Sequence, residues 1–109
     1  MFQTTRIGDS FITCQSGGFI ASGEVGKDKE PIPFQNPTNL KTFAGEGFGE
    51  VQTPLSTSHT SEYELGQPVF FRPAKSGEIA EHFRCYVLKR GDTVEKIVNT
   101  YRGDNNIFY

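Results

Sequence analysis

The sequence predicts an all-β domain, a small antiparallel barrel or sandwich. Twelve glycines and six prolines recur along the 109 residues and leave little room for a long helix. Between them lie short runs rich in β-branched and aromatic residues, a pattern typical of short strands joined by turns. Hydrophobic residues make up 35% of the chain, with ten Phe and four Tyr among them, which is enough for one core. We therefore expect a single β domain over residues 1–109.

Seven runs of β-forming residues are the candidate strands, and turn residues separate them. In chain order they are Ser10–Gln15, Gly18–Ala21, Leu40–Phe43, Phe48–Thr53, Pro68–Arg72, Glu78–Lys89 and Thr93–Arg102. Two further segments are expected to be surface loops. Residues 24–39 carry the charged run Lys27–Glu30 and three prolines, and residues 56–62 are polar.

The last two runs predict a β-hairpin. The odd positions from 79 to 87 are apolar except at Glu81, which is the alternation of a half-buried strand. Residues 89–93, with a Gly-Asp pair at their centre, form the connection, and residues 94–101 return as the second strand. Helix propensity near the start leaves a helix over residues 78–88 as the alternative, but the turn and the apolar end favour a strand.

Charge and hydropathy exclude several classes of function. Eleven Lys and Arg stand against 13 Asp and Glu, so the formal net charge is −2 and the isoelectric point is near 5.6. No basic run exceeds two residues, which argues against a dedicated nucleic-acid surface. Apolar stretches such as Val69–Phe71 are too short for a signal peptide or a membrane span. Cys14 and Cys85 belong to no metal or disulfide framework, which indicates reduced thiols in a cytoplasmic protein.

Two histidines and one glycine-rich segment are candidate chemical groups. His59 lies among serine and threonine hydroxyls, where it is either a base or a solvated loop residue, and the loop interpretation is favoured. His82 is expected at the surface of a strand, on the face opposite to Cys85, so the spacing predicts no metal site. Gly45–Gly49 has a GxGxG pattern, but no helix follows to hold a phosphate. Its glycines predict a tight turn or a close backbone approach.

The densest polar segment is Arg72–Glu78, which directly follows the apolar run Val69–Phe71. Charges at the end of a buried strand can form the rim of a binding site, and they can equally form a solvated turn. From these residues alone we expect a soluble β domain without a self-sufficient catalytic set.

Four motifs in order resemble the C-terminal region of the D-threonine aldolase, D-serine dehydratase and alanine-racemase-like group of pyridoxal-phosphate enzymes. They are Cys14–Glu24 (CQSGGFIASGE), Gly45–Leu55 (GEGFGEVQTPL), Phe70–Phe83 (FFRPAKSGEIAEHF) and Thr100–Gly103 (TYRG). In that group a barrel domain holds pyridoxal phosphate through a lysine Schiff base, and a C-terminal β domain closes the active site, often across a dimer interface. The resemblance spans residues 8–103 and implies that this chain is like the second part.

The resemblance implies a function, a cofactor and partners. The chain would gate the substrate and contribute dimer contacts in an aldolase, dehydratase or racemase that acts on D- or β-hydroxy amino acids. It would be inactive without the barrel, which holds the pyridoxal phosphate. Its partners would be that barrel domain or a second subunit, in a homo-oligomer. The alternative is a stand-alone, non-catalytic β module that binds a small ligand or a protein partner, whereas an enzyme using a histidine alone has little support.

The resemblance also implies which residues line the substrate site. They are Arg72, Lys75 and Glu78, with Gln52 and Tyr101 as weaker candidates. The planar guanidinium of Arg72 suits bidentate pairing with a substrate carboxylate. Glu78 would orient Lys75 or merely neutralise it.

Departures from the family pattern bear on metal use. Metal-activated members carry a His-x-Cys or His-x-Asp pair after a hydrophobic strand, and Pro73 and Lys75 stand at those positions here. Proline has no donor atom and an ammonium repels a cation, so no metal is expected. The Lys75 ammonium would supply positive charge in place of the metal, or else be an ordinary surface lysine. In addition, Phe48 replaces a histidine of many members, and Asp104–Asn105 departs from the usual ending.

Overall fold

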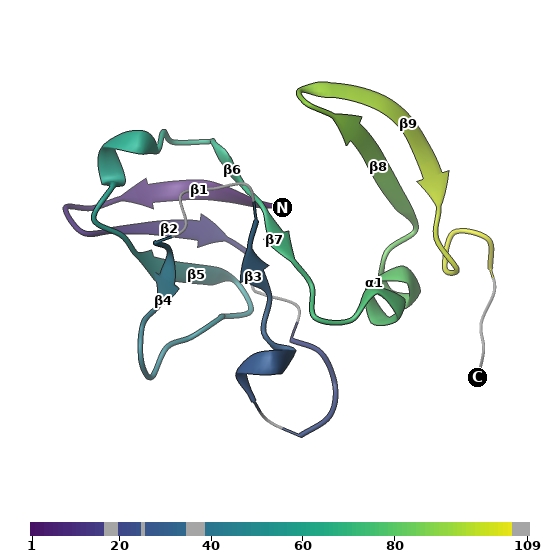
Figure 1. The fold of residues 1–109 in the computed structure, drawn as a ribbon, viewed down its shortest axis with the longest axis horizontal. Helices are drawn as coiled ribbons and strands as arrows, with labels where there is room; N and C mark the ends of the chain where they lie inside the picture. Colours follow the sequence, from purple (N-terminus) through teal and green to yellow (C-terminus); the bar gives the residue numbers. More distant parts are fainter. Residues whose placement is uncertain (17–19, 25, 35–38, 106–109) are drawn as a thin grey trace. The chain divides into compact units, whose positions relative to one another are not determined.

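The computed structural model of the chain describes residues 1–16, 20–24, 26–34 and 39–105. The chain divides into two compact units, Met1–Ala74 and Lys75–Tyr109. Strands dominate the described residues, which contain one short α-helix (Figure 1). The chain is therefore mostly β, as the composition predicts. No helix within the described ranges has the length and apolarity needed to cross a membrane.

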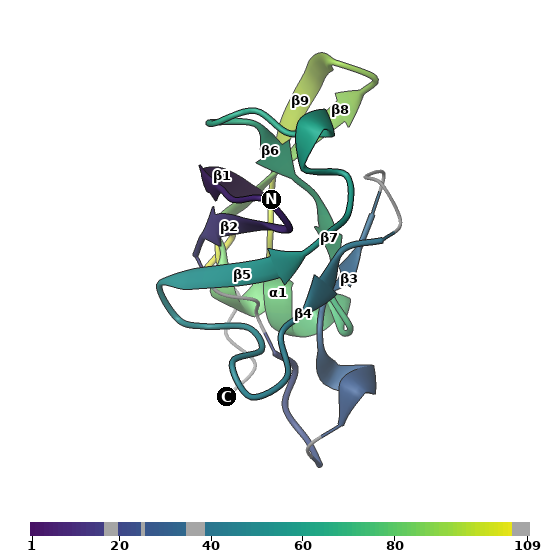
Figure 2. The ribbon, with the colours of Figure 1, turned by 90° about the vertical axis from the view of Figure 1, so that its left-hand side faces the viewer.

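The first unit is built on a five-stranded antiparallel sheet that curls into a half-barrel (Figures 1 and 2). A bulge in its strand β1, between Thr4 and Arg6, increases the local twist. A second sheet pairs two short strands, and two 3-10 turns complete the unit. The strand order in the large sheet is β4 (Lys41–Thr42), β5 (Gln52–Ser56), β2 (Phe11–Gln15), β1 (Phe2–Ile7) and β6 (Pro68–Val69). The small sheet pairs β3 (Ile32–Pro33) with β7 (Phe71–Arg72). The two 3-10 turns are η1 (Lys27–Lys29) and η2 (Thr60–Glu62).

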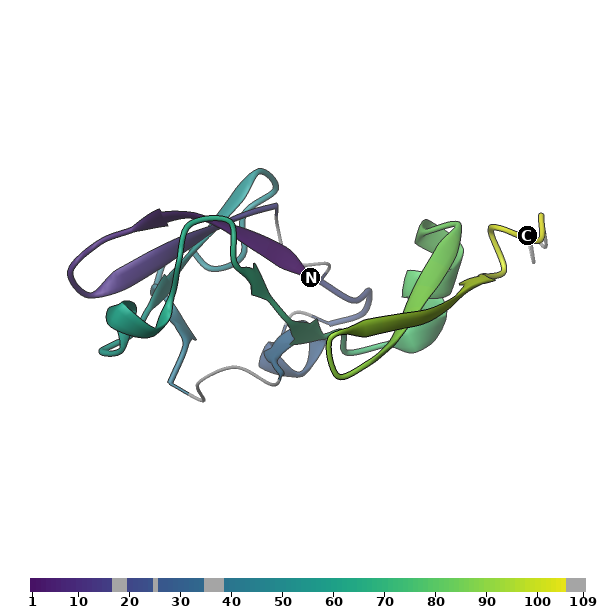
Figure 3. The same ribbon diagram turned by 90° about the horizontal axis from the view of Figure 1, so that it is seen from above.

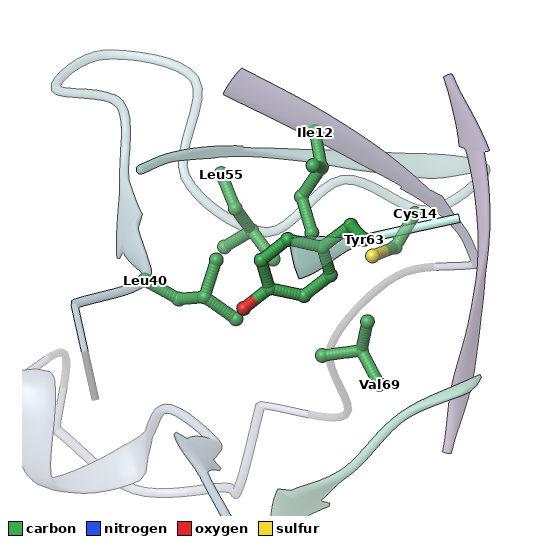
Figure 4. Close-up of a cluster of buried hydrophobic side chains, with 6 residues drawn as sticks. All are labelled: Ile12, Cys14, Leu40, Leu55, Tyr63 and Val69. Atoms are coloured by element: carbon green, nitrogen blue, oxygen red, sulfur yellow. The ribbon is translucent and has the colours of Figure 1, made fainter. Parts of the chain in front are cut away.

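The core of the first unit lies against the curled sheet (Figure 4). Its side chains come from three of the strands and from the segments beside them, and each is at most 5% exposed: Ile12, Cys14, Leu40, Leu55, Tyr63 and Val69. Along β5, Thr53 and Leu55 are buried while Gln52 is exposed, which is the period of a strand with one face on the core. This core fixes the register of the strands that carry the first two motifs.

The hydroxyl of Tyr63 points toward Leu40 in this core (Figure 4) and has no hydrogen-bond partner among the residues that the structure describes. Burial raises the pKa of the phenol. Because a buried, unpaired hydroxyl costs free energy, we expect Tyr63→Phe to raise the free energy of unfolding of the first unit by about 1 kcal/mol in urea denaturation. A decrease instead would mean that a bound water satisfies the hydroxyl. Tyr63→Leu, which also removes the ring, should destabilise the unit and serves as the contrast.

The second unit consists of α1 (Ser76–His82) and a hairpin of β8 (Cys85–Arg90) and β9 (Thr93–Asn99) (Figure 3). Tyr86 pairs with Val98 across the hairpin, and Gly91 adopts a φ of 56° in the connecting turn. The predicted hairpin is therefore confirmed, with a shorter connection than expected, Gly91 and Asp92, and a second strand that ends at Asn99.

The expected strand over Glu78–Lys89 is wrong in its first half, because Ser76–His82 is helical and strand pairing begins at Cys85, so the alternative of a helix over residues 78–88 holds for that half alone. Glu78 lies in the first turn of α1, where the helix dipole favours a carboxylate, and Ala80 is the buried residue of the helix. His82 consequently shares no strand with Cys85. That argument against a metal site is wrong as well.

The remaining expectations hold in part. Strands β2, β4, β6, β7 and β9 fall within the predicted runs, whereas β5 begins four residues later than its run, and β1 is a strand that the sequence did not predict. Gly18 and Phe19 lie outside the described residues, and Ile20 and Ala21 are in a loop. The expected loop over residues 24–39 contains η1 and β3, and its positions 25 and 35–38 are not described.

The glycine-rich segment forms the tight turn that the sequence predicts. Gly45 and Gly47 adopt φ angles of 88° and 56°, in the left-handed region that favours glycine. The segment then leads into β5.

Candidate functional site

The helical part of the third motif meets the fourth motif in the second unit. The backbone N–H of Arg102 donates to the carbonyl of Ala80 at 3.3 Å, and its Nε donates to the carbonyl of Glu81 at 3.0 Å. Both carbonyls belong to the last turn of α1, where no further helical turn supplies donors. The Thr100–Gly103 turn, called the TYRG turn below, therefore caps the C-terminal end of the helix.

Thr100 and Gly103 hold the TYRG turn in place. Thr100 is buried; its N–H donates to the Arg84 carbonyl at 3.0 Å and its hydroxyl donates to the Phe83 carbonyl. The N–H of Gly103 donates to the same hydroxyl at 3.3 Å. A Cβ at Gly103 would lie 2.0 Å from the Arg84 carbonyl oxygen, so the backbone leaves room only for glycine. Threonine and glycine at this spacing thus have a structural role.

A pocket of about 240 Å³ lies between the start of α1, the end of the hairpin and the TYRG turn. Of the predicted site residues, Tyr101 lines it. Lys75 is exposed directly before α1, and Glu78 is half-buried in the first turn of the helix. Tyr86, Asn99 and Asp104 also line the pocket, and the sequence gives no signal for the first two. The full lining is Ser76, Gly77, Ala80, Tyr86, Asn99, Thr100, Tyr101 and Asp104.

Arg72 lies in the first unit, on β7. Its side chain is exposed, and its Cζ lies 4.8 Å from the centre of the Phe34 ring. The N–H of Phe34 donates to the Phe70 carbonyl at 2.8 Å, which holds the ring beside β7. A cation–π contact of this kind orients the guanidinium plane and leaves its N–H edge for an anion.

Gln52 lies at the start of β5, in register with Gln15, which is in turn in register with Gln3. The three glutamines form an exposed row across β5, β2 and β1. Beside the row is a pocket of about 470 Å³, which Gln52 itself does not line. The first two motifs meet there, because the N–H of Ser16 donates to the Val51 carbonyl at 2.6 Å. The lining is Met1, Phe2, Gln3, Gln15, Ser16, Glu50 and Val51.

His59 belongs to a hydrogen-bonded loop network in the first unit. Its Nδ1 accepts a hydrogen bond from Asn39 Nδ2, and Ser58 Oγ lies 3.1 Å from the same nitrogen. The Thr57 hydroxyl donates to Asn39 Oδ1 at 3.2 Å and accepts the N–H of His59 at 3.0 Å. Since Nδ1 is already engaged, this network favours the structural interpretation of His59 over a base for Ser58. Asn39 is the member that sequence reasoning missed.

The two thiols differ in chemistry. Cys14 is buried and Cys85 is exposed, and neither forms a disulfide. Burial raises the pKa of the Cys14 thiol to about 11, with a smaller opposing effect of the Thr4 hydroxyl, so little thiolate forms at pH 7. Across residues 1–16, 20–24, 26–34 and 39–105, no group of three His, Cys, Asp or Glu side chains is close enough to hold a metal ion.

The described residues do not fit a pyridoxal phosphate site. Lys75 is exposed, and the Gly45–Gly49 turn leads into a strand rather than into a helix that would hold the phosphate. Comparison of the chain with protein-family models, curated proteins and solved structures gave no match.

Proposed function

We propose that this chain is the C-terminal β domain of a pyridoxal-phosphate-dependent aldolase, dehydratase or racemase acting on D- or β-hydroxy amino acids. The supporting observation is that two of the motifs behind the resemblance, distant in sequence, meet through the hydrogen bonds of Arg102 to α1. The cofactor would be held by a barrel domain outside this chain. The fold proposed for the chain is accordingly that of the C-terminal domain of fold-type III enzymes.

In this proposal the chain closes the active site over the substrate and contributes to a dimer contact. Arg72 binds the substrate carboxylate, since the Phe34 ring supports its guanidinium and no ion pair of Arg72 occurs in the part of the chain that is described. Lys75, Glu78 and Tyr101 act from the second unit, next to the pocket beside α1. Gln52 contributes a side-chain amide from the exposed face of β5.

The mass of the endogenous protein tests this proposal first. An antibody against the domain should detect a band of roughly 40 kDa, which is a barrel of about 250 residues plus this chain. A band near 12.1 kDa would mean that the domain occurs alone and would refute the enzyme proposal.

Arg72→Ala, made in the protein that includes the barrel, is expected to raise KM for the amino acid about 10- to 100-fold, because a charge-assisted hydrogen-bonded pair contributes about 1.5–3 kcal/mol. Arg72→Lys should raise KM by a smaller factor than Arg72→Ala but should not restore the original value, since an ammonium cannot form the bidentate fork. The matched control is Arg6→Lys, because Arg6 also lies over an aromatic ring, 5.7 Å from the centre of Phe11. Equal effects of Arg72→Lys and Arg6→Lys on KM would contradict the assignment.

The second candidate function is a stand-alone β module that binds a small ligand. The observation that favours it is the 240 Å³ pocket, whose lining residues all belong to the second unit. Hydrodynamic measurements and the binding of a hydrophobic dye discriminate the two proposals. A domain separated from its barrel should self-associate or bind a hydrophobic dye through the apolar surface left uncovered, whereas an independent module should be monodisperse.

A further inference from the structure

The pocket beside α1 is lined by small residues of the helix and by two tyrosines, one from β8 and one from the TYRG turn. Gly77 and Ala80 line it without side chains beyond Cβ, and a Cβ built on Gly77 would meet no heavy atom within 4 Å. Tyr86 is half-buried and Tyr101 is 47% exposed. At about 240 Å³, the pocket suits a small aliphatic ligand rather than a nucleotide or another large cofactor.

The charge of the pocket is negative. Asp104 lines it, whereas none of its lining residues is basic. Asn99 Nδ2 donates to Asp104 Oδ1 at 2.9 Å, and the N–H of Asp104 donates to the Thr100 carbonyl at 3.0 Å, so the carboxylate is held at the pocket by both its side chain and its backbone. Three cations neighbour the lining residues without lining the pocket: Lys75, Arg84 and Arg102, of which Arg102 directs its Nε to the Glu81 carbonyl. A cationic ligand is therefore favoured over an anionic one.

We propose that this pocket binds the ammonium group of a small aliphatic amine. Asp104 supplies the opposite charge, Tyr86 and Tyr101 supply aromatic lining of the kind that attracts a cation, and the alkyl part of the ligand occupies the space beside Gly77 and Ala80. The inference goes beyond the enzyme proposal and deepens the second candidate function, on which it rests, because it names the ligand class of the same pocket; every group that it uses belongs to the second unit and it involves no cofactor.

The test is an NMR titration of the full, ¹⁵N-labelled chain with n-propylammonium, using 1-propanol as the neutral isostere and propionate as the anion. We expect saturable shifts of the backbone amides of Gly77, Ala80, Tyr101 and Asp104 with n-propylammonium. The affinity for 1-propanol should be at least about fivefold lower, and propionate should not bind. An equal response to 1-propanol, or shifts confined to other parts of the chain, would overturn the proposal.

Matched variants separate this site from a general charge effect. Asp104→Asn removes the charge but keeps an oxygen that can accept from Asn99, and it should weaken n-propylammonium binding about fivefold. Asp92→Asn removes the same charge from the exposed hairpin turn of the same unit and should leave the affinity unchanged. Equal losses in the two variants would overturn the proposal. Tyr101→Leu, at an exposed position, should weaken binding about threefold in a chain with an unchanged spectrum elsewhere.

The outcome for this pocket and the outcome for the proposed function are independent. Detection of an endogenous band near 12.1 kDa would refute the enzyme proposal and leave amine binding by the chain intact. Absence of n-propylammonium binding together with a band of roughly 40 kDa would refute only the amine site.

Discussion

Gly103→Ala is expected to destabilise the second unit by about 3 kcal/mol, the upper end of the cost of overpacking. The new Cβ would lie 2.0 Å from the backbone carbonyl oxygen of Arg84 and 3.1 Å from Asn99 Cβ. The Arg84 carbonyl accepts the N–H of Thr100, so its displacement breaks the bond that joins the TYRG turn to the start of the hairpin. With the turn displaced, Arg102 no longer caps α1.

Amide hydrogen exchange measures this effect residue by residue. In Gly103→Ala, the amides of Thr100 and Arg102 should exchange about 100-fold faster than in the unchanged chain. The matched control is Gly77→Ala in the same unit, because a Cβ at that position meets open space. It should preserve the slow exchange, and its higher helix propensity should add up to about 1 kcal/mol of stability. Equal acceleration in both variants would contradict the close approach at Gly103.

The hairpin of the second unit exposes much of its apolar surface. An isolated two-stranded hairpin is marginally stable in water, since neither face is covered. The hairpin exposes four large hydrophobic side chains, each between 44% and 63% accessible: Val87, Leu88, Val94 and Ile97. Contacts made by the TYRG turn to α1 and to the Phe83–Arg84 link therefore carry much of the order of this unit.

The sequence predicted strands where β-forming residues lie between turn residues, as at β2 and β9. It could not predict β1, because the bulge between Thr4 and Arg6 leaves two residues, an even number, between the core-facing Thr4 and Ile7 and so breaks the alternation. The opposite error occurred at α1. Apolar residues at positions 79, 83, 85 and 87 imitate a strand, but the first two belong to a helix and its cap, and the helix depends on the distant Arg102 for hydrogen bonds to its last carbonyls.

The candidate site was predictable only in part, because contacts between residues distant in the sequence form it. Arg72, Lys75 and Glu78 stand out in sequence as charges after an apolar run, and Tyr101 lies within a motif. Asn99 and Tyr86 could not be recognised as site residues from the sequence, because only the folded hairpin of β8 and β9 places them at the pocket beside α1. Likewise, a sequence gives no sign that Phe34 lies under Arg72, because that contact depends on the pairing of β3 with β7.

Leu55→Ala is expected to lower the free energy of unfolding of the first unit by about 3 kcal/mol, within the range for emptying a well-packed leucine site. Leu55 is 1% exposed and lies in β5, paired with Ile12 on one side and Thr42 on the other, so neighbouring strands prevent the backbone from collapsing into the space. A domain of this size has few such residues, and 3 kcal/mol is a large part of a total of about 5 kcal/mol.

Urea denaturation followed by tyrosine fluorescence checks this expectation, because Tyr63 lies in the same core as Leu55 (Figure 4). Val51→Ala is the matched control: Val51 directly precedes β5 and is 78% exposed, so its truncation should change the free energy of unfolding by less than about 0.5 kcal/mol. Leu55→Met nearly preserves the volume and should cost less than about 1.5 kcal/mol. If Leu55→Ala were as mild as Val51→Ala, the half-barrel core would be wrong, because a leucine enclosed by three strands cannot be removed without leaving a cavity.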